Sequence, residues 1–365
     1  MLGSLRLRTP RRRATPRAVL AAGAMLLLVS AVALSGCTTN NPQTTLTPRG
    51  PQAQYIYDLF VTWLFWPAVV VFFAVEGLLI YSVFRFRGRP GDPLPAQLHG
   101  NTRLEVTWTL IPALILAVIL AVTFRTQAVL ATPPTGEFIT VRVIGHQWWW
   151  EFQYPDLGVT TANEMHIPLD VPIQLELSSA DVIHSYWVPH LAGKMDAIPG
   201  RINRMKLQAS EAGVYSGQCS EFCGIQHAMM RMLLVAESRS EFDAWVRNER
   251  SIPSFAAGTT PPVAPAGAPP AAESLVTRGA QVFANGACIT CHAIRGTAAQ
   301  ARVGPELTHF GSRRSIAANT LTNTPENLRR WLRNPQAVKP GNLMPNVNLS
   351  DQDTEALVAY LQSLK

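Results

Sequence analysis

Two long apolar segments, residues 59–84 and 106–125, constrain the fold of this chain more than any other feature. Each is close to the roughly 20 residues that a helix needs to cross a bilayer. The loop between them, residues 85–105, is rich in arginine, with Asp92 as an acidic neighbour. The arginines are Arg85, Arg87, Arg89 and Arg103. Since cytoplasmic loops are enriched in Lys and Arg, this loop should face the cytoplasm and both ends of the chain should lie outside.

The first 36 residues have the composition of a bacterial export signal. They hold six arginines and no acidic residue, and an apolar run from Ala18 to Leu34 is followed by Ser-Gly-Cys37. The tetrapeptide Leu-Ser-Gly-Cys resembles a lipobox, at which residues 1–36 would be removed and Cys37 would carry lipid. An uncleaved membrane helix is the alternative, although the apolar run is short for a bilayer. Without the six arginines the formal charge of +7 falls to about +1, so no nucleic-acid partner is expected.

A cluster of soft metal ligands lies in residues 219–230, Cys219-Ser-Glu-Phe-Cys-Gly-Ile-Gln-His-Ala-Met-Met230. Thiolate, imidazole and thioether together favour copper over zinc or a hard cation. A second imidazole is available upstream from His184. Two cysteines four residues apart can reach the same ions, and two bridging thiolates suit a pair of copper ions. A structural disulfide between these cysteines and a zinc site are the alternatives.

The residues around these ligands resemble a known family. The run from His184 to Arg201, His-Ser-Tyr-Trp-Val-Pro-His-Leu-Ala-Gly-Lys-Met-Asp-Ala-Ile-Pro-Gly-Arg, precedes the pattern Cys-x-Glu-x-Cys-x-x-x-His-x-x-Met. Both are similar to the dinuclear copper (CuA) domain of cytochrome c oxidase subunit II. The resemblance implies two bridging cysteines, one histidine on each copper and a weak thioether ligand, namely Cys219, Cys223, His184, His227 and Met230. It also implies that Glu221 binds through its backbone carbonyl and turns its carboxylate towards a magnesium ion shared with subunit I.

Residues 137–240 carry short alternating apolar runs split by Pro, Gly and Asn, a pattern typical of a β-sandwich. The resemblance implies the all-β cupredoxin form of the sandwich, with the metal loops at one end. Within it, Gly145-His-Gln-Trp148-Trp149-Trp150 places three indoles in a row. Since alternate residues of a strand face solvent, at least one indole is expected to be exposed for a partner.

The resemblance assigns Trp148 as the residue through which electrons arrive from cytochrome c, with simple packing under a loop as the alternative. Trp149 is expected to be a packing residue, at a position where the family usually has Tyr. His146 and His190 are additional imidazoles near the site. We expect both to be surface or neighbouring residues, because the copper ligand set is already complete without them.

Two carboxylates lie in or beside the apolar segments. Glu105, in Leu-Glu-Val-Thr-Trp-Thr-Leu-Ile-Pro, matches the subunit II glutamate that in this family marks the mouth of a proton channel in subunit I. The alternative is a solvated carboxylate at a helix start, which the helix dipole favours. Glu76 lies deeper in the first segment, where an ionisable group usually faces protein, so contact with a partner helix is expected.

Two further stretches are predicted to be connectors. Residues 37–58 are polar with several prolines near their start and form an exposed spacer. Residues 251–272 are rich in Pro and Ala and carry no charge, which predicts a semi-rigid linker. A tethered domain, residues 273–365, is therefore expected beyond the linker.

That domain carries Cys288-Ile-Thr-Cys291-His292, the signature of covalent c-type haem attachment. The two thiols would bond to the haem vinyl groups, and His292 would bind the iron. Met344, held between turn-forming residues, is the candidate second iron ligand. His/Met ligation tends to raise the haem potential, which suits an electron carrier. A disulfide or redox pair is the alternative.

Three helices are predicted around this haem signature. One lies near residues 275–283, a second starts at Thr324 and stops before Pro335, and a third is capped by Ser350. The first and last of these helices resemble the crossed terminal helices of class I cytochrome c. The residues that carry this resemblance are Gly279, Phe283 and Tyr360.

Together these features predict a membrane-anchored multidomain chain with a two-helix transmembrane hairpin, an all-β cupredoxin-like sandwich and an all-α class I cytochrome c domain. The resemblance implies subunit II of a caa-type haem-copper oxidase, in which haem c passes electrons to CuA and on to subunit I for oxygen reduction coupled to proton transport. Expected partners are subunit I, subunit III, the lipid membrane, and a donor such as a cytochrome bc complex or another cytochrome c. The expected location is the bacterial plasma membrane, with both soluble domains on its outer face. The alternative from a different class is a membrane-anchored lipoprotein for copper delivery or storage.

Overall fold

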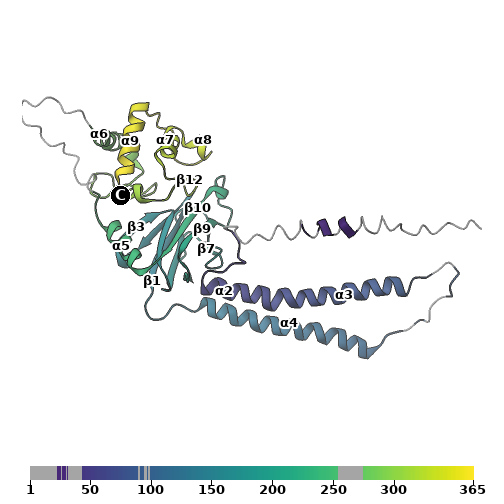
Figure 1. Cartoon of the computed structure of the whole chain (residues 1–365). Helices are drawn as coiled ribbons and strands as arrows, with labels where there is room; N and C mark the ends of the chain where they lie inside the picture. Colours follow the sequence, from purple (N-terminus) through teal and green to yellow (C-terminus); the bar gives the residue numbers. More distant parts are fainter. Residues whose placement is uncertain are drawn as a thin grey trace, which may run out of the picture.

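The computed structural model describes residues 23–25, 27–29, 31, 43–88, 91–93, 97, 99–253 and 274–365. The predicted lipid site at Cys37 and nearly all of the predicted linker lie outside these residues. Figure 1 shows three parts: a pair of long helices, a sandwich of strands, and a small helical domain that lies against the sandwich. We call the last part, residues 274–365, the C-terminal domain.

The pair of helices agrees with the two apolar segments. The first runs without a break through α2 (Pro51–Tyr57), a π-helical stretch (Asp58–Phe65) and α3 (Trp66–Arg85). The second is α4 (Thr102–Ala131). By length and composition, these two helices of the described chain could cross a membrane, with mean hydropathies of 2.1 and 2.3. Both helices extend beyond the apolar segments themselves.

The extra length of the first helix serves to join it to the sandwich. The Ala53 N–H donates to Leu191 O at 3.1 Å, and Ala53 is buried. Just before the helix, a Cβ on Gly50 would lie 1.9 Å from Gln208 O, so only glycine allows this approach. The start of α2 is therefore fixed by tertiary contacts that an apolar pattern does not report.

The sandwich has two five-stranded sheets, in the orders β3-β2-β1-β5-β8 and β4-β10-β9-β6-β7. Its strands are β1 Ile139–His146, β2 Trp149–Tyr154, β3 Val159–Ala162, β4 Glu164–Pro168, β5 Ile173–Ser179, β6 His184–Trp187, β7 Met195–Ala197, β8 Asn203–Leu207, β9 Gly213–Cys219 and β10 Arg231–Glu237. Alternate residues of β5 are buried, and they form a continuous core with those of β1. Helix α5 (Arg239–Arg250) follows β10 and begins with a capping box at Ser238. The predicted β-sandwich is confirmed.

The C-terminal domain contains α6 (Leu275–Asn285), α7 (Pro325–Arg333), α8 (Pro335–Val338) and α9 (Asp351–Ser363). It also has the short strands β11 Ser315–Ile316 and β12 Leu321–Thr322, and 3-10 turns at Ala287–Thr290 and Phe310–Ser312. The hydroxyl of Thr324 caps α7 and that of Ser350 caps α9, so both predicted helix starts are confirmed. The short helix α8 was not predicted.

The crossing of α6 and α9 is also confirmed. A Cβ on Gly279 would lie 2.0 Å from Ala356 O, so the two helix backbones are in direct contact there. One turn further along, the rings of Phe283 and Tyr360 pack with centroids 6.0 Å apart. The glycine permits the close approach and the two rings fill the space beside it.

The tryptophan motif corrects one prediction. Trp148, Trp149 and Trp150 are 8%, 9% and 0% exposed, so the expectation of an exposed indole is wrong. Trp150 packs in the sandwich core. The C-terminal domain covers the other two indoles. Its Ala318 packs on Trp149, and its Lys339 Nζ donates to Trp148 O at 2.9 Å.

Candidate copper and haem sites

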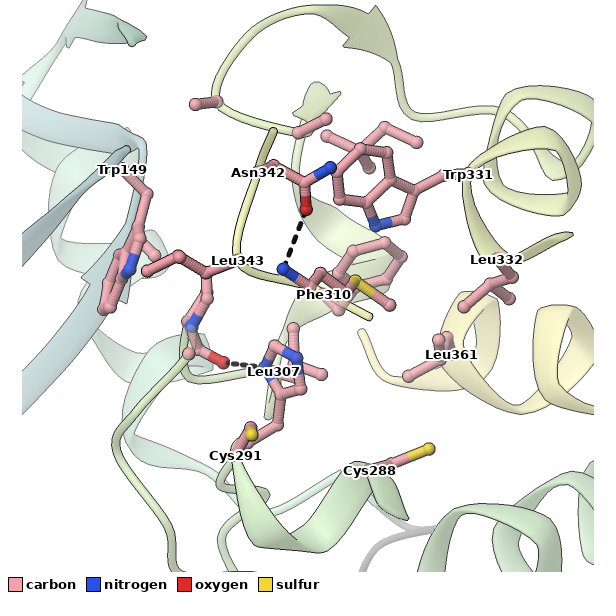
Figure 2. Close-up of a pocket in the computed structure, with 18 of the residues that line it drawn as sticks. Trp149, Cys288, Cys291, Leu307, Phe310, Trp331, Leu332, Asn342, Leu343 and Leu361 are labelled. Carbon is pink, nitrogen blue, oxygen red and sulfur yellow. Dashed lines mark hydrogen bonds between the residues drawn. The ribbon is translucent and has the colours of Figure 1, made fainter. Parts of the chain in front are cut away.

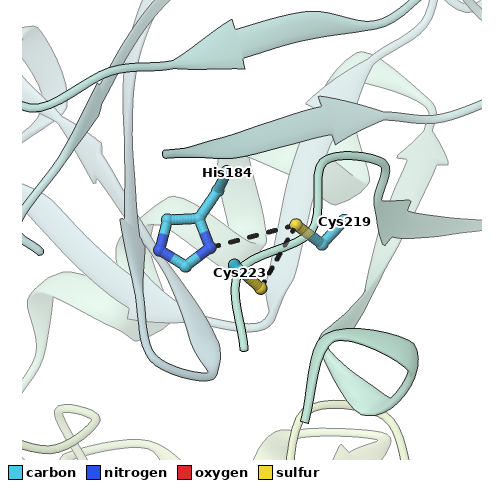
Figure 3. A group of neighbouring side chains, drawn as sticks. All are labelled: His184, Cys219 and Cys223. Carbon is cyan, nitrogen blue, oxygen red and sulfur yellow. Dashed lines mark hydrogen bonds between the residues drawn. The ribbon is translucent and has the colours of Figure 1, made fainter. Parts of the chain in front are cut away.

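The pairing of two strands brings the candidate copper ligands together. Strands β6 and β9 run antiparallel with Tyr186 opposite Cys219, so His184 at the start of β6 lies beside the end of β9. Figure 3 shows His184, Cys219 and Cys223 pointing towards one another. Their ligand atoms all lie within 4.8 Å of one another, and all three residues are buried.

The remaining donors extend this cluster. Cys219 Sγ lies 3.9 Å from His184 Nδ1 and 3.7 Å from Cys223 Sγ. Cys223 Sγ lies 3.7 Å from His227 Nδ1 and 3.8 Å from Met230 Sδ. A disulfide has a sulfur separation of about 2.05 Å, so the two thiols are free in this structure. Two sulfurs at the centre, with an imidazole and other soft donors around them, match a dinuclear copper site.

Asp181 orients one of the imidazoles. Its Oδ1 accepts from His184 Nε2 at 2.8 Å, which leaves Nδ1 directed at the sulfurs. Metal-ligating histidines typically carry such a partner on the other ring nitrogen. Asp181 stands three residues before His184, a spacing that could have indicated this partner from the sequence.

The two thiols influence each other's protonation. The contact between the two thiols lowers the pKa of Cys219. The same contact with Cys219, together with burial, raises the pKa of Cys223. Thiolate is the form that binds metal, so metal binding would be coupled to release of protons from this pair.

Trp148 lies directly against this cluster. Its Nε1–H donates to Cys223 O at 3.0 Å, and the Gln147 side-chain amide donates to the same carbonyl at 2.8 Å. The indole therefore contacts the backbone of a candidate ligand. Trp149 stacks on His146 instead, with ring centroids 4.1 Å apart and planes 7° from parallel.

The second candidate site is a cavity of about 250 Å³ between the C-terminal domain and the tryptophan motif of the sandwich. It is lined by Cys288, Cys291, His292 and Met344. Figure 2 shows Cys288 and Cys291 on one side of it and Trp149 of the sandwich on another. The cavity walls are largely apolar, with Leu307, Phe310, Trp331, Leu332 and Leu361 among them.

His292 is held as an iron ligand would be. Its Nδ1–H donates to Pro305 O at 2.7 Å, which leaves Nε2 free for iron. Burial lowers the pKa of His292, which favours the neutral imidazole that binds iron. A Cβ on Gly304 would lie 2.6 Å from the imidazole Cε1, so glycine is needed beside the ring. The residues of this cavity thus fit a covalently attached haem.

Comparison with known proteins matches all three parts of the chain. Family profiles match "Cytochrome C oxidase subunit II, transmembrane domain" at residues 43–126, the "periplasmic domain" of the same subunit at 158–237, and "Cytochrome c" at 276–365. Cytochrome c oxidase subunit 2 of Alkalihalophilus pseudofirmus is 41% identical over 345 residues, which cover 91% of this chain and 94% of that protein. This chain belongs to the cytochrome c oxidase subunit II family.

Two other relatives cover different shares of the chain. Cytochrome c oxidase subunit 2 of Bacillus subtilis is 34% identical and is matched over 93% of this chain and 97% of its own length. The crystal structure of the periplasmic domain of subunit II (CoxB) of Bradyrhizobium japonicum is 32% identical, with a TM-score of 0.32, and covers 33% of this chain and 97% of that one. As a subunit II with a cytochrome c domain, the chain has a cupredoxin-like sandwich, and its two soluble domains imply CuA copper and haem c.

The structure also places several other residues of this subunit II chain. Glu105 is exposed at the start of α4, where its Oε1 accepts from the Asn101 N–H at 3.2 Å. Glu221 is exposed, and its backbone carbonyl lies 3.3 Å from Cys219 Sγ. His190 Nδ1 donates to Thr47 O at 2.9 Å, away from the copper cluster. Lys339, buried against Trp148, was missed because nothing in its local sequence distinguishes it.

Proposed function

We propose that this chain is the electron-accepting subunit of a respiratory cytochrome c oxidase. In that role the C-terminal domain would hold a haem c that receives electrons from a donor, and the sandwich would hold the dinuclear CuA centre through which they reach subunit I. Oxygen reduction and the coupled proton transport occur in subunit I. The observation that carries the proposal is the unbroken contact from the haem cavity through Trp148 to Cys223 O.

The chain's own residues supply binding and orientation. Cys219, Cys223, His184, His227 and Met230 would hold two copper ions, and the carbonyl of Glu221 would be a further ligand. When bound, the copper pair and the haem each gain and lose one electron reversibly. Asp181 keeps the His184 ring in place. Rigid ligands limit the rearrangement that accompanies a change of charge, which favours fast transfer.

Two pairs of residues would hold the haem, one through covalent bonds and one through the iron. Cys288 and Cys291 would anchor the haem covalently, and His292 and Met344 would bind its iron. The Pro305 carbonyl fixes the His292 ring through Nδ1. Trp148 is the residue through which we propose that electrons enter the copper domain, because its indole bonds to the backbone of Cys223.

Several finer assignments belong to the same proposal. The Glu221 carboxylate, exposed next to the ligand loop, would share a magnesium ion with subunit I. Glu105 would stand at the mouth of a proton channel of subunit I, at the cytoplasmic end of α4. Subunit III and an upstream donor such as a cytochrome bc complex or another cytochrome c complete the partners. The chain would cross the plasma membrane twice, with Cys37 lipidated and both soluble domains outside.

Metal and haem analysis of the full chain, with optical and electron paramagnetic resonance spectra, tests the proposal. We expect a copper pair that shares one unpaired electron beside one low-spin haem c. Stopped-flow reduction should then show electrons moving from haem c to copper, more slowly in Trp148→Leu. A single isolated copper, or copper readily removed by chelators in a chain without haem, would favour copper delivery or storage instead.

A further inference from the structure

A buried cluster of ionisable side chains lies where α5 and β4 meet the C-terminal domain, and the proposed function does not use it. At its centre is Glu249, near the end of α5, which is 4% exposed. The ionisable groups that interact with its carboxylate come from three parts of the chain. They are Arg295, Glu306 and Arg313 of the C-terminal domain, His166 of β4 and Tyr154 of β2.

Several polar atoms of this cluster lack partners. Glu249 Oε2, Glu306 Oε2, His309 Nδ1 and Arg313 Nε are buried without a hydrogen-bond partner in the part of the chain that the structure describes. Burial penalises the charged form of a carboxyl group more than the protonated form. Burial accordingly raises the pKa of Glu249 to about 7, against the opposing charge of Arg313, and it also raises the pKa of Glu306. Glu249 therefore changes its protonation state near neutral pH.

The other carboxylates around β4 are already paired. Glu237 Oε1 lies 2.9 Å from His166 Nδ1, and Glu164 Oε1 lies 3.3 Å from His166 Nε2. Burial lowers the pKa of His166, but these two hydrogen bonds outweigh it and raise the pKa overall. His166 thus keeps its positive charge more readily than a free histidine, and Glu164 and Glu237 share that charge. Glu249, with Oε2 unpaired, is the carboxylate best placed to gain or lose a proton.

Arg313 and Glu306 connect the cluster to the haem cavity. Arg313 lines the cavity, and its guanidinium lies 3.5 Å from Glu306 Oε2. Glu306 directly follows Pro305, whose carbonyl accepts from His292 Nδ1. Besides burial, the charge of Arg313 lowers the pKa of His292. Electrostatic effects therefore reach the proposed iron ligand from the edge of this cluster.

A change of charge at the iron must alter the proton affinity of a carboxyl group in such surroundings. Reduction adds one negative charge, and a nearby negative charge raises the pKa of a carboxyl group. Salt screens buried charges much less than exposed ones, so the effect extends further than it would at the surface. The coupling is reciprocal, because a proton on the carboxyl group raises the affinity of the iron for an electron by the same factor.

We infer that Glu249 is a proton-binding site coupled to the redox state of the haem. When one electron from the donor reduces the haem iron, Glu249 takes up a proton from water. It releases that proton when the electron passes on to the copper pair, so only the O–H bond of the carboxyl group forms and breaks. The haem would then hold its electron more tightly when the outer side of the membrane is acidic. This inference rests on the proposed function, and the experiment below separates the two.

Redox titration of the haem in the full chain, with small-molecule mediators and absorbance detection from about pH 5 to 9, measures the coupling. The wild-type midpoint potential should fall from one plateau to another as the pH rises through about 7. A tenfold rise in proton affinity on reduction corresponds to a fall of about 59 mV. Glu249→Gln keeps the size of the side chain but does not ionise, so its potential should stay at the acidic plateau. The matched control Glu326→Gln removes an exposed carboxylate of α7 and should behave as the wild type.

A second variant tests the direction of the coupling. Glu306 raises the pKa of Glu249, so Glu306→Gln should move the fall in potential to lower pH without abolishing it. Infrared difference spectra give a readout that does not depend on the potential. Reduction near neutral pH should increase the absorption of protonated carboxyl groups, and this increase should be lost in Glu249→Gln. The optical spectrum of the ligated haem reports whether each variant is folded.

The outcomes separate this inference from the proposed function. A wild-type potential that does not change with pH in this range would overturn the inference. A pH dependence that persists in Glu249→Gln would also overturn it, because the proton would then bind to another group, such as His166 or the carboxylates of the haem. A chain that takes up no haem would overturn both, whereas a reduced haem that never passes its electron to copper would overturn only the proposed function.

Discussion

The acid-base behaviour of Glu249 provides a quantitative test of how the C-terminal domain is held. Glu249 is 4% exposed near the end of α5, and its Oε2 has no hydrogen-bond partner among the described residues. Burial raises the pKa of Glu249 from its ordinary value of 4.5 to about 7, against the opposing charge of Arg313. Glu306 of the C-terminal domain raises it further, whereas His166 lowers it. We predict that Glu249→Gln changes stability in a strongly pH-dependent way.

The size and sign of the effect follow from the two pKa values. The folded chain keeps a proton on Glu249 that the unfolded chain releases above pH 4.5. Stability from this group is therefore complete below pH 4.5 and is lost progressively as the pH rises to about 7. Each pKa unit corresponds to about 1.4 kcal/mol, so the loss is roughly 3 kcal/mol. Glutamine does not ionise and should avoid this loss.

The assay is chemical unfolding of the full chain, followed by haem absorbance between pH 4.5 and 8. Glu249→Gln and wild type should be similar in stability at the acidic end, and the variant should be more stable by roughly 3 kcal/mol at pH 8. Glu326→Gln, at an exposed position in the first turn of α7, is the matched control and should show no such divergence. A difference between Glu249→Gln and wild type that does not grow with pH, or a wild type that is more stable at pH 8, would refute the reasoning.

Three further predictions concern packing and the two candidate sites. Gly279→Ala should destabilise the C-terminal domain by about 1–3 kcal/mol in the same unfolding assay, because its Cβ would lie 2.0 Å from Ala356 O; an unchanged midpoint would contradict the helix crossing. Cys223→Ser should abolish the electron paramagnetic resonance signal of an electron shared by two coppers, and its survival would remove Cys223 from the ligand set. Met344→Ala should lower the haem potential in a redox titration, whereas an unchanged potential would exclude the thioether as an iron ligand.

Local sequence signals predicted the elements that are stabilised locally. Thr324 and Ser350 cap α7 and α9 through hydrogen bonds to backbone N–H groups three residues ahead, so a short pattern was sufficient to find them. Gly279 could be recognised for a similar reason, through its resemblance to a known helix crossing. Strand β2 was harder to anticipate, because Trp149 and Trp150 are both buried and the alternation of a half-exposed strand is lost.

The candidate copper site could be predicted because chemistry, rather than local structure, links its members. His184 lies 35 residues before Cys219, and no short-range pattern joins them. His184 was predicted because an imidazole completes the set of soft ligands formed by Cys219, Cys223 and their neighbours. The supporting residues Asp181 and Gln147 were missed because they bind no metal themselves. Asp181 holds a ligand ring and its spacing before His184 was the one local signal, whereas the role of Gln147 in holding a ligand carbonyl depends on the folded geometry.

The contact between the sandwich and the C-terminal domain could not be predicted, because the residues on each side of it carry no distinctive sequence pattern. Lys339 and Trp148 are 191 positions apart, and lysine, alanine and glutamate are common surface residues. Lys339 and Ala318 are both buried in the structure, where they contact Trp148 and Trp149. If this contact had been selected for stability alone, apolar residues would serve better than Lys339 and Glu249, whose burial opposes ionisation of both. Their presence therefore favours a surface that fixes orientation, as the proposed electron transfer from the C-terminal domain to Trp148 requires.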